Sequence, residues 1–406
     1  MPDVEFVNLL IVAAIALTAP LLLGLAPALR VPAVVLEIVA GIVVGPSGLG
    51  WVEIDLPVQI VALLGLAFLL FLAGLEIDVH RLSGQALLGY VVTLAVGLAA
   101  GFAFQAAGWV QSPLLLAVTL SATSLGLIVP VLKDAGRVDG DAGQVAIAGA
   151  SVADFAAIIL LSLAFSMSGG GLGGRVGLLG LFAGLVVLTG LVIVFAGRSR
   201  RLADALFRLQ DTTAEIRVRA AVVLLVAFVA LAEELGLESI LGAFLAGVVV
   251  GVIDRDTTSH PRFRIKLEAV GYGFLIPVFF VTSGLRLDLG GLLADAGALA
   301  RVPLFLVALL LARGLPAFLH VRSLPRRDVF AVALLQATSL PFIVTATQIG
   351  VAVGLMSPVT AAALTCAGLL SVLLFPAGAV GLLSTRDPDQ TNEGAREVTN
   401  LPTVGD

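Results

Sequence analysis

The sequence predicts an all-helical, polytopic membrane protein of about thirteen transmembrane helices, and its composition and charge-free runs carry that prediction. Of the 406 residues, 59% are hydrophobic and only 13% are charged, and the mean hydropathy is +1.11. Soluble domains are closer to half apolar and a quarter charged. Residues 58–75 and 84–132 contain no charged side chain, whereas about 20 apolar residues suffice to cross a bilayer.

Charged residues, glycines and prolines divide the apolar sequence into thirteen segments. The division is least distinct near residues 236–239, where two segments nearly touch. Each boundary is set to within about 2–4 residues. The predicted spans are 6–28, 33–50, 58–77, 85–108, 112–132, 144–167, 176–196, 217–236, 238–253, 267–287, 291–319, 328–350 and 355–383.

The distribution of basic residues tests this count independently. When the connecting loops are numbered in order, the odd loops and the C-terminal tail hold 19 of the 23 Lys and Arg residues. The even loops hold only Arg175 and Arg286, while Arg301 and Arg313 lie in or near a span. Because cytoplasmic loops are rich in Lys and Arg, we expect an external N-terminus and a cytoplasmic C-terminus in the cell (inner or plasma) membrane.

Composition also excludes several classes of protein. The single cysteine, Cys366, excludes a disulfide framework or a cysteine metal cluster. The three histidines lie far apart without an HExxH pattern, so a zinc peptidase is not indicated. A net charge of −5 indicates no nucleic-acid surface. We expect a lipid-embedded protein that is not an enzyme and that needs no cofactor.

Three short motifs recur in the same order, 206 to 215 residues later in the chain. The partners of each pair lie an odd number of spans apart, so the two copies would insert in opposite directions. Such an inverted-topology repeat is common in secondary transporters; chance similarity among Gly- and Ala-rich helices is the alternative. The pairs are 120–129 with 335–344 (seven of ten positions identical), 74–78 with 284–288, and 40–45 with 246–251.

The first pair also predicts two broken helices near the membrane midplane. Thr123-Ser124 and Thr338-Ser339 lie in mid-span, and each is followed by glycine or proline, which weaken the helical hydrogen-bond ladder. Broken helices expose backbone groups to ions in transporters. Ordinary kinked helices, whose hydroxyls bond to their own backbone, are the alternative.

One acid and one base lie deep in the predicted spans. Asp154 has no charged neighbour within ten residues on either side, and Ser151 lies three residues earlier on the same helical face. Arg313 is the corresponding basic residue. Charges inside spans are costly and usually functional. A carboxylate that holds either a proton or a monovalent cation, but not both, suffices for antiport; a static Asp154–Arg313 ion pair is the alternative.

Several motifs resemble the second monovalent cation:proton antiporter family, which includes Kef-type and NapA-like proteins. The resemblance covers about residues 5–384. It depends on Phe71-Leu-Ala-Gly-Leu-Glu-Ile-Asp78, Leu241-Gly-Ala-Phe-Leu-Ala-Gly247, Pro277-Val-Phe-Phe-Val281 with Gly284, and Val43-Val-Gly-Pro-Ser-Gly-Leu-Gly50.

This resemblance implies an antiporter of Na⁺ or K⁺ against H⁺, with elevator-like motion in a homodimer. The membrane domain would span 1–384, with core helices at about 58–167 and 267–383 that include the two broken helices crossing each other, and with the remaining helices as dimerisation scaffold. Residues 385–406 would be a disordered cytoplasmic tail without a nucleotide-binding regulatory domain. The family's ion-binding aspartate would fall on Asp154, with its basic partner at Arg313. We expect Ser151, Thr123 and Ser124 to bind the ion or proton together with Asp154, and Thr338 and Ser339 to belong to the supporting broken helix.

The sequence departs from the family beside that aspartate and in the twelfth span. Ala153 stands where an acid or amide is common, so one carboxylate would carry one proton per cation and the exchange would be electroneutral. Leu340-Pro341 replaces a common Gly-Glu pair, which leaves the choice among Na⁺, Li⁺ and K⁺ open. An organic-anion or solute symporter and a non-transporting sensor or channel are the alternative functions.

Overall fold

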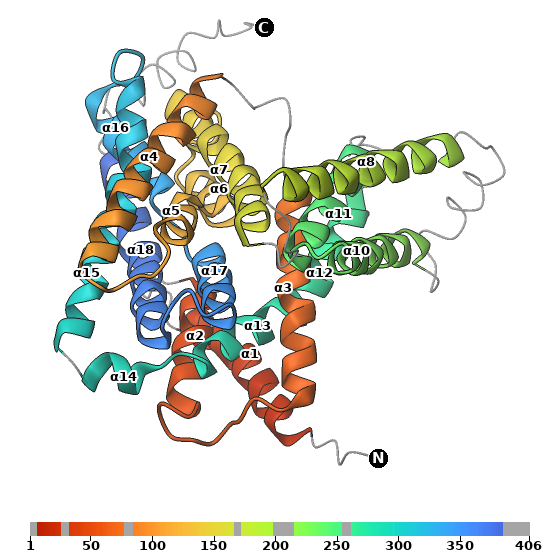
Figure 1. The fold of residues 1–406 in the computed structure, drawn as a ribbon, viewed down its shortest axis with the longest axis horizontal. Coiled ribbons are helices and arrows are strands. Elements are labelled where there is room, and N and C mark those ends of the chain that lie inside the picture. Colours follow the sequence, from red (N-terminus) through yellow and green to blue (C-terminus); the bar gives the residue numbers. More distant parts are fainter. Residues whose placement is uncertain are drawn as a thin grey trace, which may run out of the picture.

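The computed structural model describes residues 6–25, 32–76, 84–165, 172–197, 215–253, 261–294 and 296–384, and most of these residues lie in helices (Figure 1). The first half of the chain contains α1 (Val7–Leu25), α2 (Ala33–Val44), α3 (Leu56–Glu76), α4 (Gly84–Ala106), α5 (Pro113–Ser121), α6 (Leu125–Asp134) and α7 (Asp141–Phe165). The chain continues with α8 (Leu172–Gly197), α10 (Ile216–Glu234), α11 (Ser239–Ile253), α12 (Pro261–Val270), the π-helix η2 (Gly271–Leu275), α13 (Ile276–Leu285), α14 (Leu289–Ala294), α15 (Ala296–Gly314), the 3-10 helix η3 (Leu315–His320), α16 (Arg326–Gln336), α17 (Pro341–Ala352) and α18 (Pro358–Ser384).

Each of the thirteen predicted spans coincides with one helix or with consecutive helices in the described part of the chain. Eight of the described helical stretches are long and apolar enough to cross a membrane, and four shorter ones are apolar. The remaining span is α10, a helix of 19 residues with charged residues near both ends. The all-helical, polytopic prediction is confirmed.

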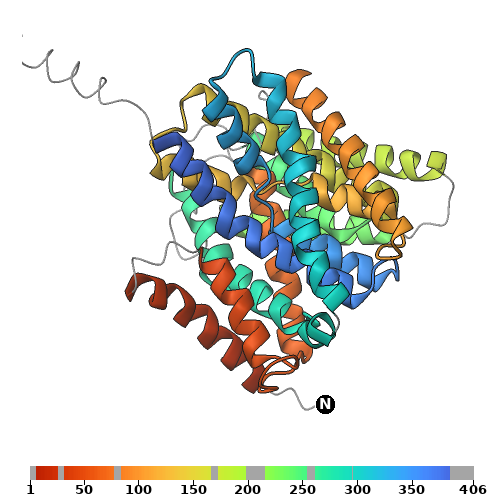
Figure 2. The ribbon, with the colours of Figure 1, turned by 90° about the vertical axis from the view of Figure 1, so that its left-hand side faces the viewer.

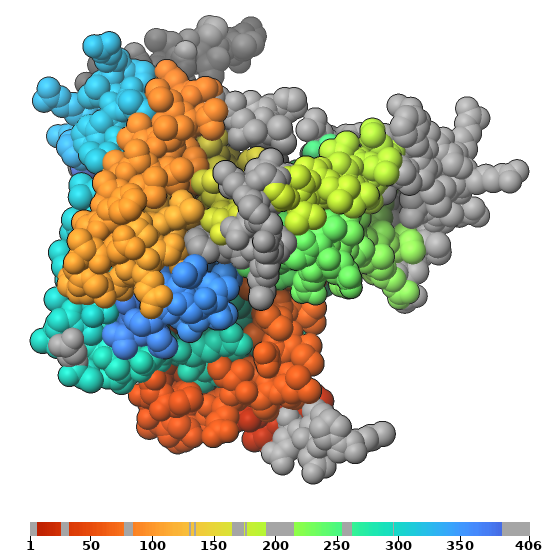
Figure 3. All heavy atoms as spheres, in the orientation of Figure 1, coloured from red at the N-terminus to blue at the C-terminus, as the bar shows by residue number. Residues whose placement is uncertain are grey.

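The helices pack into two groups. The core bundle contains α4–α7 and α15–α18, and the scaffold bundle contains α1–α3, α8 and α10–α13. Figure 1 shows α4, α15, α16 and α18 on the left and α3, α8, α10 and α11 on the right. From the side, α15 and α18 run next to each other in front (Figure 2), and α4 covers one face of the core bundle (Figure 3).

Glycines permit close helix packing within the scaffold bundle. A Cβ atom on Gly41 of α2 would collide with the carbonyl oxygen of Val281 in α13, and one on Gly284 of α13 would collide with that of Ile38 in α2. Two backbones in such contact admit only glycine, as in many membrane helix pairs. The close approach of α2 and α13 therefore depends on these two glycines.

The same contact recurs between α3 and α11, where Gly74 and Gly247 each touch the opposite backbone. In the predicted repeat Gly41 corresponds to Gly247, and Gly74 to Gly284. The α2–α13 contact thus joins residues 40–45 of the first copy to residues 284–288 of the second. The α3–α11 contact joins residues 74–78 of the first copy to residues 246–251 of the second. Exchange of partners of this kind is expected of two copies related by a two-fold axis, and it supports the predicted inverted repeat.

Candidate functional site

Two interrupted helices meet at the centre of the core bundle. Residues 122–124 separate α5 from α6, and residues 337–340 separate α16 from α17. The backbone N–H of Ser124 donates to the carbonyl oxygen of Thr338 at 3.1 Å, so the two breaks contact each other directly. The first break precedes Gly126 and Pro130, which lie inside α6, whereas Pro341 opens α17 as its first residue. Proline fits that position because a first-turn N–H has no helical partner.

Asp154 of α7 faces the start of α6. One carboxylate oxygen accepts from the backbone N–H of Thr123 at 3.2 Å, and the other accepts from that of Leu125 at 3.3 Å. The first N–H groups of a helix lack intrahelical acceptors and favour an anion. The two backbone bonds therefore hold both carboxylate oxygens against the start of α6.

A short hydrogen-bonded connection links this carboxylate to Arg313. The Thr123 hydroxyl donates to the carbonyl oxygen of Gln336 at 2.8 Å, and the Arg313 Nε donates to the same oxygen at 3.2 Å. Thr123 therefore bonds to Asp154 through its backbone and to the second broken helix through its side chain. Gln336 is the last residue of α16, so its carbonyl has no helical N–H partner.

Arg313 is buried, with 2% of its surface exposed, and its three closest acceptors are neutral. Besides Gln336, its Nη1 donates to the Thr93 hydroxyl at 3.3 Å and its Nη2 to the carbonyl oxygen of Gly149 at 3.5 Å. In the described part of the chain, Asp154 and Arg313 form no ion pair within 4.0 Å, although each charge influences the other electrostatically. The static ion pair considered from the sequence is therefore absent, and the two charges connect through Thr123 and Gln336.

The other predicted hydroxyls bond within their own elements or lie without a bond. Ser151 donates to the carbonyl oxygen of Ile147 in the preceding turn, and Thr338 donates to that of Leu334. The Ser124 side chain makes no capping bond to α6. The Ser339 hydroxyl is buried without a partner among the described residues. Ser151 precedes Asp154 by three residues in α7, and Ser124 lies in the first break between the two residues that donate to Asp154, whereas Thr338 and Ser339 belong to the second break.

Gln336 and Gly149 are the participants that sequence reasoning did not assign to the site. The Gln336 side chain bonds across helices, since its Nε2 donates to the carbonyl oxygen of Val145 at 3.5 Å. A Cβ atom on Gly149 would collide with this amide, so the glycine makes room for it. Two features of the sequence could have indicated these residues. Gln336 is a polar residue within the repeated motif, and Gly149 is a glycine five residues before Asp154.

Among the described residues, no three His, Cys, Asp or Glu side chains gather into a metal-binding group. A cation at Asp154 would therefore depend on one carboxylate together with hydroxyl and carbonyl oxygens. Oxygen ligands of this kind suit hard, weakly bound cations rather than zinc or iron.

Comparison with known proteins gives consistent matches. The model of the family described as sodium/hydrogen exchanger, transmembrane, matches residues 13–384. The chain is 32% identical over 395 residues to a putative Na⁺/H⁺ antiporter, YjbQ, of Bacillus subtilis, covering 93% of this chain and 63% of that protein. It is 28% identical to the Na⁺/H⁺-K⁺ antiporter GerN of Bacillus cereus, covering 71% and 74%. The sodium proton antiporter MjNhaP1 of Methanocaldococcus jannaschii has the same fold, with a TM-score of 0.64 at 17% identity over 93% of this chain and 98% of that structure.

Proposed function

Because this chain belongs to the sodium/hydrogen exchanger family, a family of transporters rather than enzymes, we propose that it exchanges Na⁺ for H⁺ across a membrane at Asp154. One observation carries this proposal: the Asp154 carboxylate accepts from two N–H groups of the first break, where that break contacts the second. The chain spans less than two thirds of the length of YjbQ. The activity proposed is therefore that of the membrane domain.

The arrangement around Asp154 supports competition between the two ions. An ionised carboxylate offers about four lone-pair positions, and the N–H groups of Thr123 and Leu125 occupy two of them. The remaining positions can hold a proton or contribute to a cation's ligand shell, but protonation removes the charge that attracts the cation. Oxygen atoms of Ser151 and Ser124 lie on the adjoining turns of α7 and α6 and are candidate further ligands.

The two-bundle packing supports an elevator-like motion. Both breaks and Asp154 belong to the core bundle, and helices α3 and α13 pack chiefly on α2, α11 and each other. The packing favours a moving body of α4–α7 and α15–α18, narrower than the 58–167 and 267–383 expected from the sequence, because those ranges include α3 and α13. Alternating access would follow from displacement of this body along the scaffold bundle.

Electroneutral exchange is the stoichiometry that the site favours. Ala153 supplies no second carboxylate beside Asp154, so one proton would leave for each cation that enters. Arg313 does not change this balance, because a guanidinium stays protonated in proteins.

The remaining expectations complete the proposal. The loop charges favour an external N-terminus and a cytoplasmic C-terminus in the plasma membrane, and the family resemblance favours a homodimer. The similarity to GerN, an antiporter named for Na⁺ and K⁺, makes K⁺ the second cation to test. Residues 385–406, the expected tail, lie outside the described residues.

The test measures proton flux in proteoliposomes that contain a pH-sensitive dye. Na⁺, Li⁺ and K⁺ are added in turn to wild type, Asp154→Asn and Asp139→Asn, the last being an exposed loop residue of the core bundle. We expect cation-driven flux in wild type and Asp139→Asn and its loss in Asp154→Asn. Flux that persists in Asp154→Asn would contradict the site, and its absence in correctly folded wild type would contradict antiport.

A further inference from the structure

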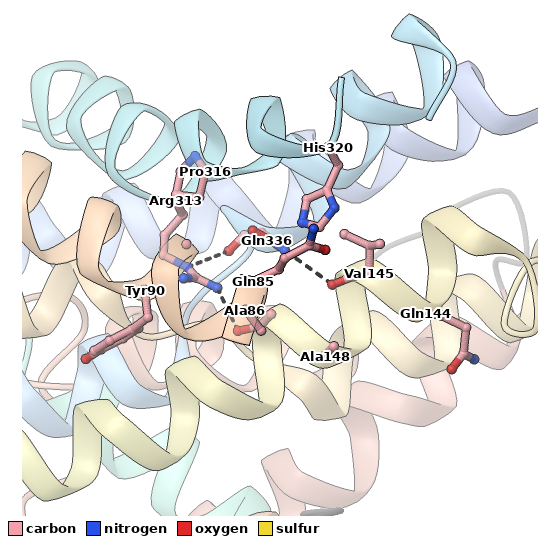
Figure 4. Close-up of a pocket in the computed structure, with 12 residues that line it drawn as sticks. Gln85, Ala86, Tyr90, Gln144, Val145, Ala148, Arg313, Pro316, His320 and Gln336 are labelled. Atoms are coloured by element: carbon pink, nitrogen blue, oxygen red, sulfur yellow. Dashed lines mark hydrogen bonds between the residues drawn. The ribbon is translucent and has the colours of Figure 1, made fainter. Parts of the chain in front are cut away.

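Next to Arg313 lies a cavity of about 260 Å³ between α4, α7, η3 and α16 (Figure 4). It extends from the start of α4 and of α7 and the end of η3, at one end of the core bundle, as far as Gln336 beside the second break. The basic loops predict that this end is cytoplasmic. Arg313 and Gln336 form part of its wall, with Gln85, Gln144 and His320 among the other polar residues.

The lining of this cavity is unsuited to a cation. Its residues include three amides, a phenol, an imidazole and the Arg313 guanidinium, but no carboxylate. The site at Asp154 has the opposite character, and Asp154 does not line this cavity. A cation entering beside Arg313 would meet a positive charge in a low-dielectric surrounding, where such repulsion is strong.

Arg313 also retains donors for a further ligand. A guanidinium has five N–H groups, and three of them donate to protein acceptors within the described residues, one at the long distance of 3.5 Å. All three acceptors are neutral oxygens. A buried charge is costly unless it is paired, and the opposite charge of Asp154 is not in contact with Arg313.

We propose that this cavity binds a small inorganic anion, chloride-sized, against the guanidinium of Arg313. Water occupies about 30 Å³ per molecule, so the space accommodates such an ion with part of its hydration shell. The Gln85 amide and the His320 ring supply further donors from α4 and η3. Gln85 is exposed and His320 is partly exposed, which leaves an approach from solution.

The anion site would be linked to the cation site, and this part of the inference rests on the proposed function. When Asp154 is ionised and empty, its charge partly offsets that of Arg313; when Asp154 binds a proton or Na⁺, that compensation is lost. The anion should therefore bind more tightly to the loaded carrier. By thermodynamic reciprocity the anion should strengthen cation binding by the same factor, and coupling of this kind typically reaches about 5-fold or more.

Direct binding of radioactive chloride to the purified full-length protein, with gluconate as the replacement anion, tests the site without transport. We expect one saturable site per chain, with affinity raised about 5-fold or more by saturating Na⁺. Asp154→Asn should bind chloride with the higher affinity even without Na⁺. Gln85→Glu, which places a carboxylate beside the cavity, should weaken chloride binding at least about 10-fold, while Gln105→Glu near the other end of α4 should leave it unchanged.

A transport measurement tests the consequence. Replacing chloride by gluconate should raise the KM for Na⁺ about 5-fold in wild type and leave it unchanged in Gln85→Glu, whose carboxylate replaces the anion. Absence of saturable chloride binding in wild type would overturn the proposal. Binding that neither Asp154→Asn nor Gln85→Glu alters would also overturn it, because the ion would then lie elsewhere. Since binding is measured without flux, failure of the antiport proposal and failure of the anion site give different results.

Discussion

Thr123 and Thr338 occupy equivalent positions in the two breaks, and the structure predicts that the same substitution has different effects at each. Both side chains are buried, with exposed fractions of 2% and 0%. The Thr123 hydroxyl joins the two broken helices by donating to Gln336, whereas the Thr338 hydroxyl donates to its own preceding turn at Leu334. Threonine-to-valine substitution removes each hydroxyl with little change in volume, so packing is matched between the two variants.

The expected magnitude follows from the Thr123 hydrogen bond. Hydrogen bonds between membrane helices contribute about 0.6 kcal/mol on average and up to about 1.7 kcal/mol. The Thr123 bond is short, and the same residue holds the Asp154 carboxylate through its backbone N–H. Its loss should therefore weaken cation binding about 3- to 20-fold, by the relation of about 1.4 kcal/mol to tenfold. Thr338→Val removes no contact between the breaks and should change binding less than about 2-fold.

The assay is cation-dependent proton flux in proteoliposomes, with KM and kcat determined separately for both variants. Thr123→Val should raise the KM for Na⁺, since the carboxylate is less well positioned before any ion binds. Equal KM values for the two variants, or a larger effect at Thr338, would refute the view that the Thr123 side chain positions the site. Circular dichroism and detergent-solubilised thermal unfolding establish that both variants are folded.

Three further perturbations test packing and charge by thermal unfolding. Gly41→Ala should destabilise the protein by about 1–3 kcal/mol, because its Cβ would meet backbone rather than a movable side chain, whereas Gly24→Ala, with open space around it, should not. Gly149→Ala should lower the free energy of unfolding more in wild type than in a Gln336→Ala background, because the Gln336 amide with which the new Cβ collides is absent from that background. A double-mutant cycle without coupling would contradict this contact. Burial raises the pKa of Glu238, in the loop between α10 and α11. Its contribution to the free energy of unfolding is therefore complete below the usual glutamate pKa of about 4.3. That contribution is lost as pH rises through the higher folded-state pKa. Glu238→Gln should therefore show a smaller loss of stability over that pH rise, and an unchanged pH profile would contradict the assignment.

The helices of the fold were predictable because a segment inside a membrane must consist mainly of apolar residues. Every span is apolar over a length set by the bilayer, and the basic loops restrict the count independently. The breaks at Thr123 and Thr338 were also predictable, since the repeated motif places polar residues with proline or glycine in mid-span. Asp154 could be selected because an isolated charge within a span has few structural reasons to persist.

The connections within the site were not predictable in the same way. Asp154 is bound by backbone N–H groups, which every residue except proline possesses, so residue type gives no sign of them. Gln336 contributes mainly its backbone carbonyl, which is equally invisible in the sequence. The spacing between Asp154 and Arg313 along the chain contains no information about their separation across helices. That these two expected partners are not in direct contact could therefore not be predicted.

If ions exchange at Asp154, as we propose, its indirect connection to Arg313 is better suited to that exchange than a direct ion pair would be. A direct pair would have to separate each time a cation bound, and breaking a buried pair by removing one partner costs about 3–5 kcal/mol. Here Thr123 and the Gln336 carbonyl stand between the two groups, so the carboxylate keeps lone pairs free for an ion. Arg313 meanwhile anchors the end of α16 to α4 and α7 through Thr93 and Gly149. The arginine can thus fix the geometry of the second break and offset charge at a distance without occupying the position that the transported ion needs.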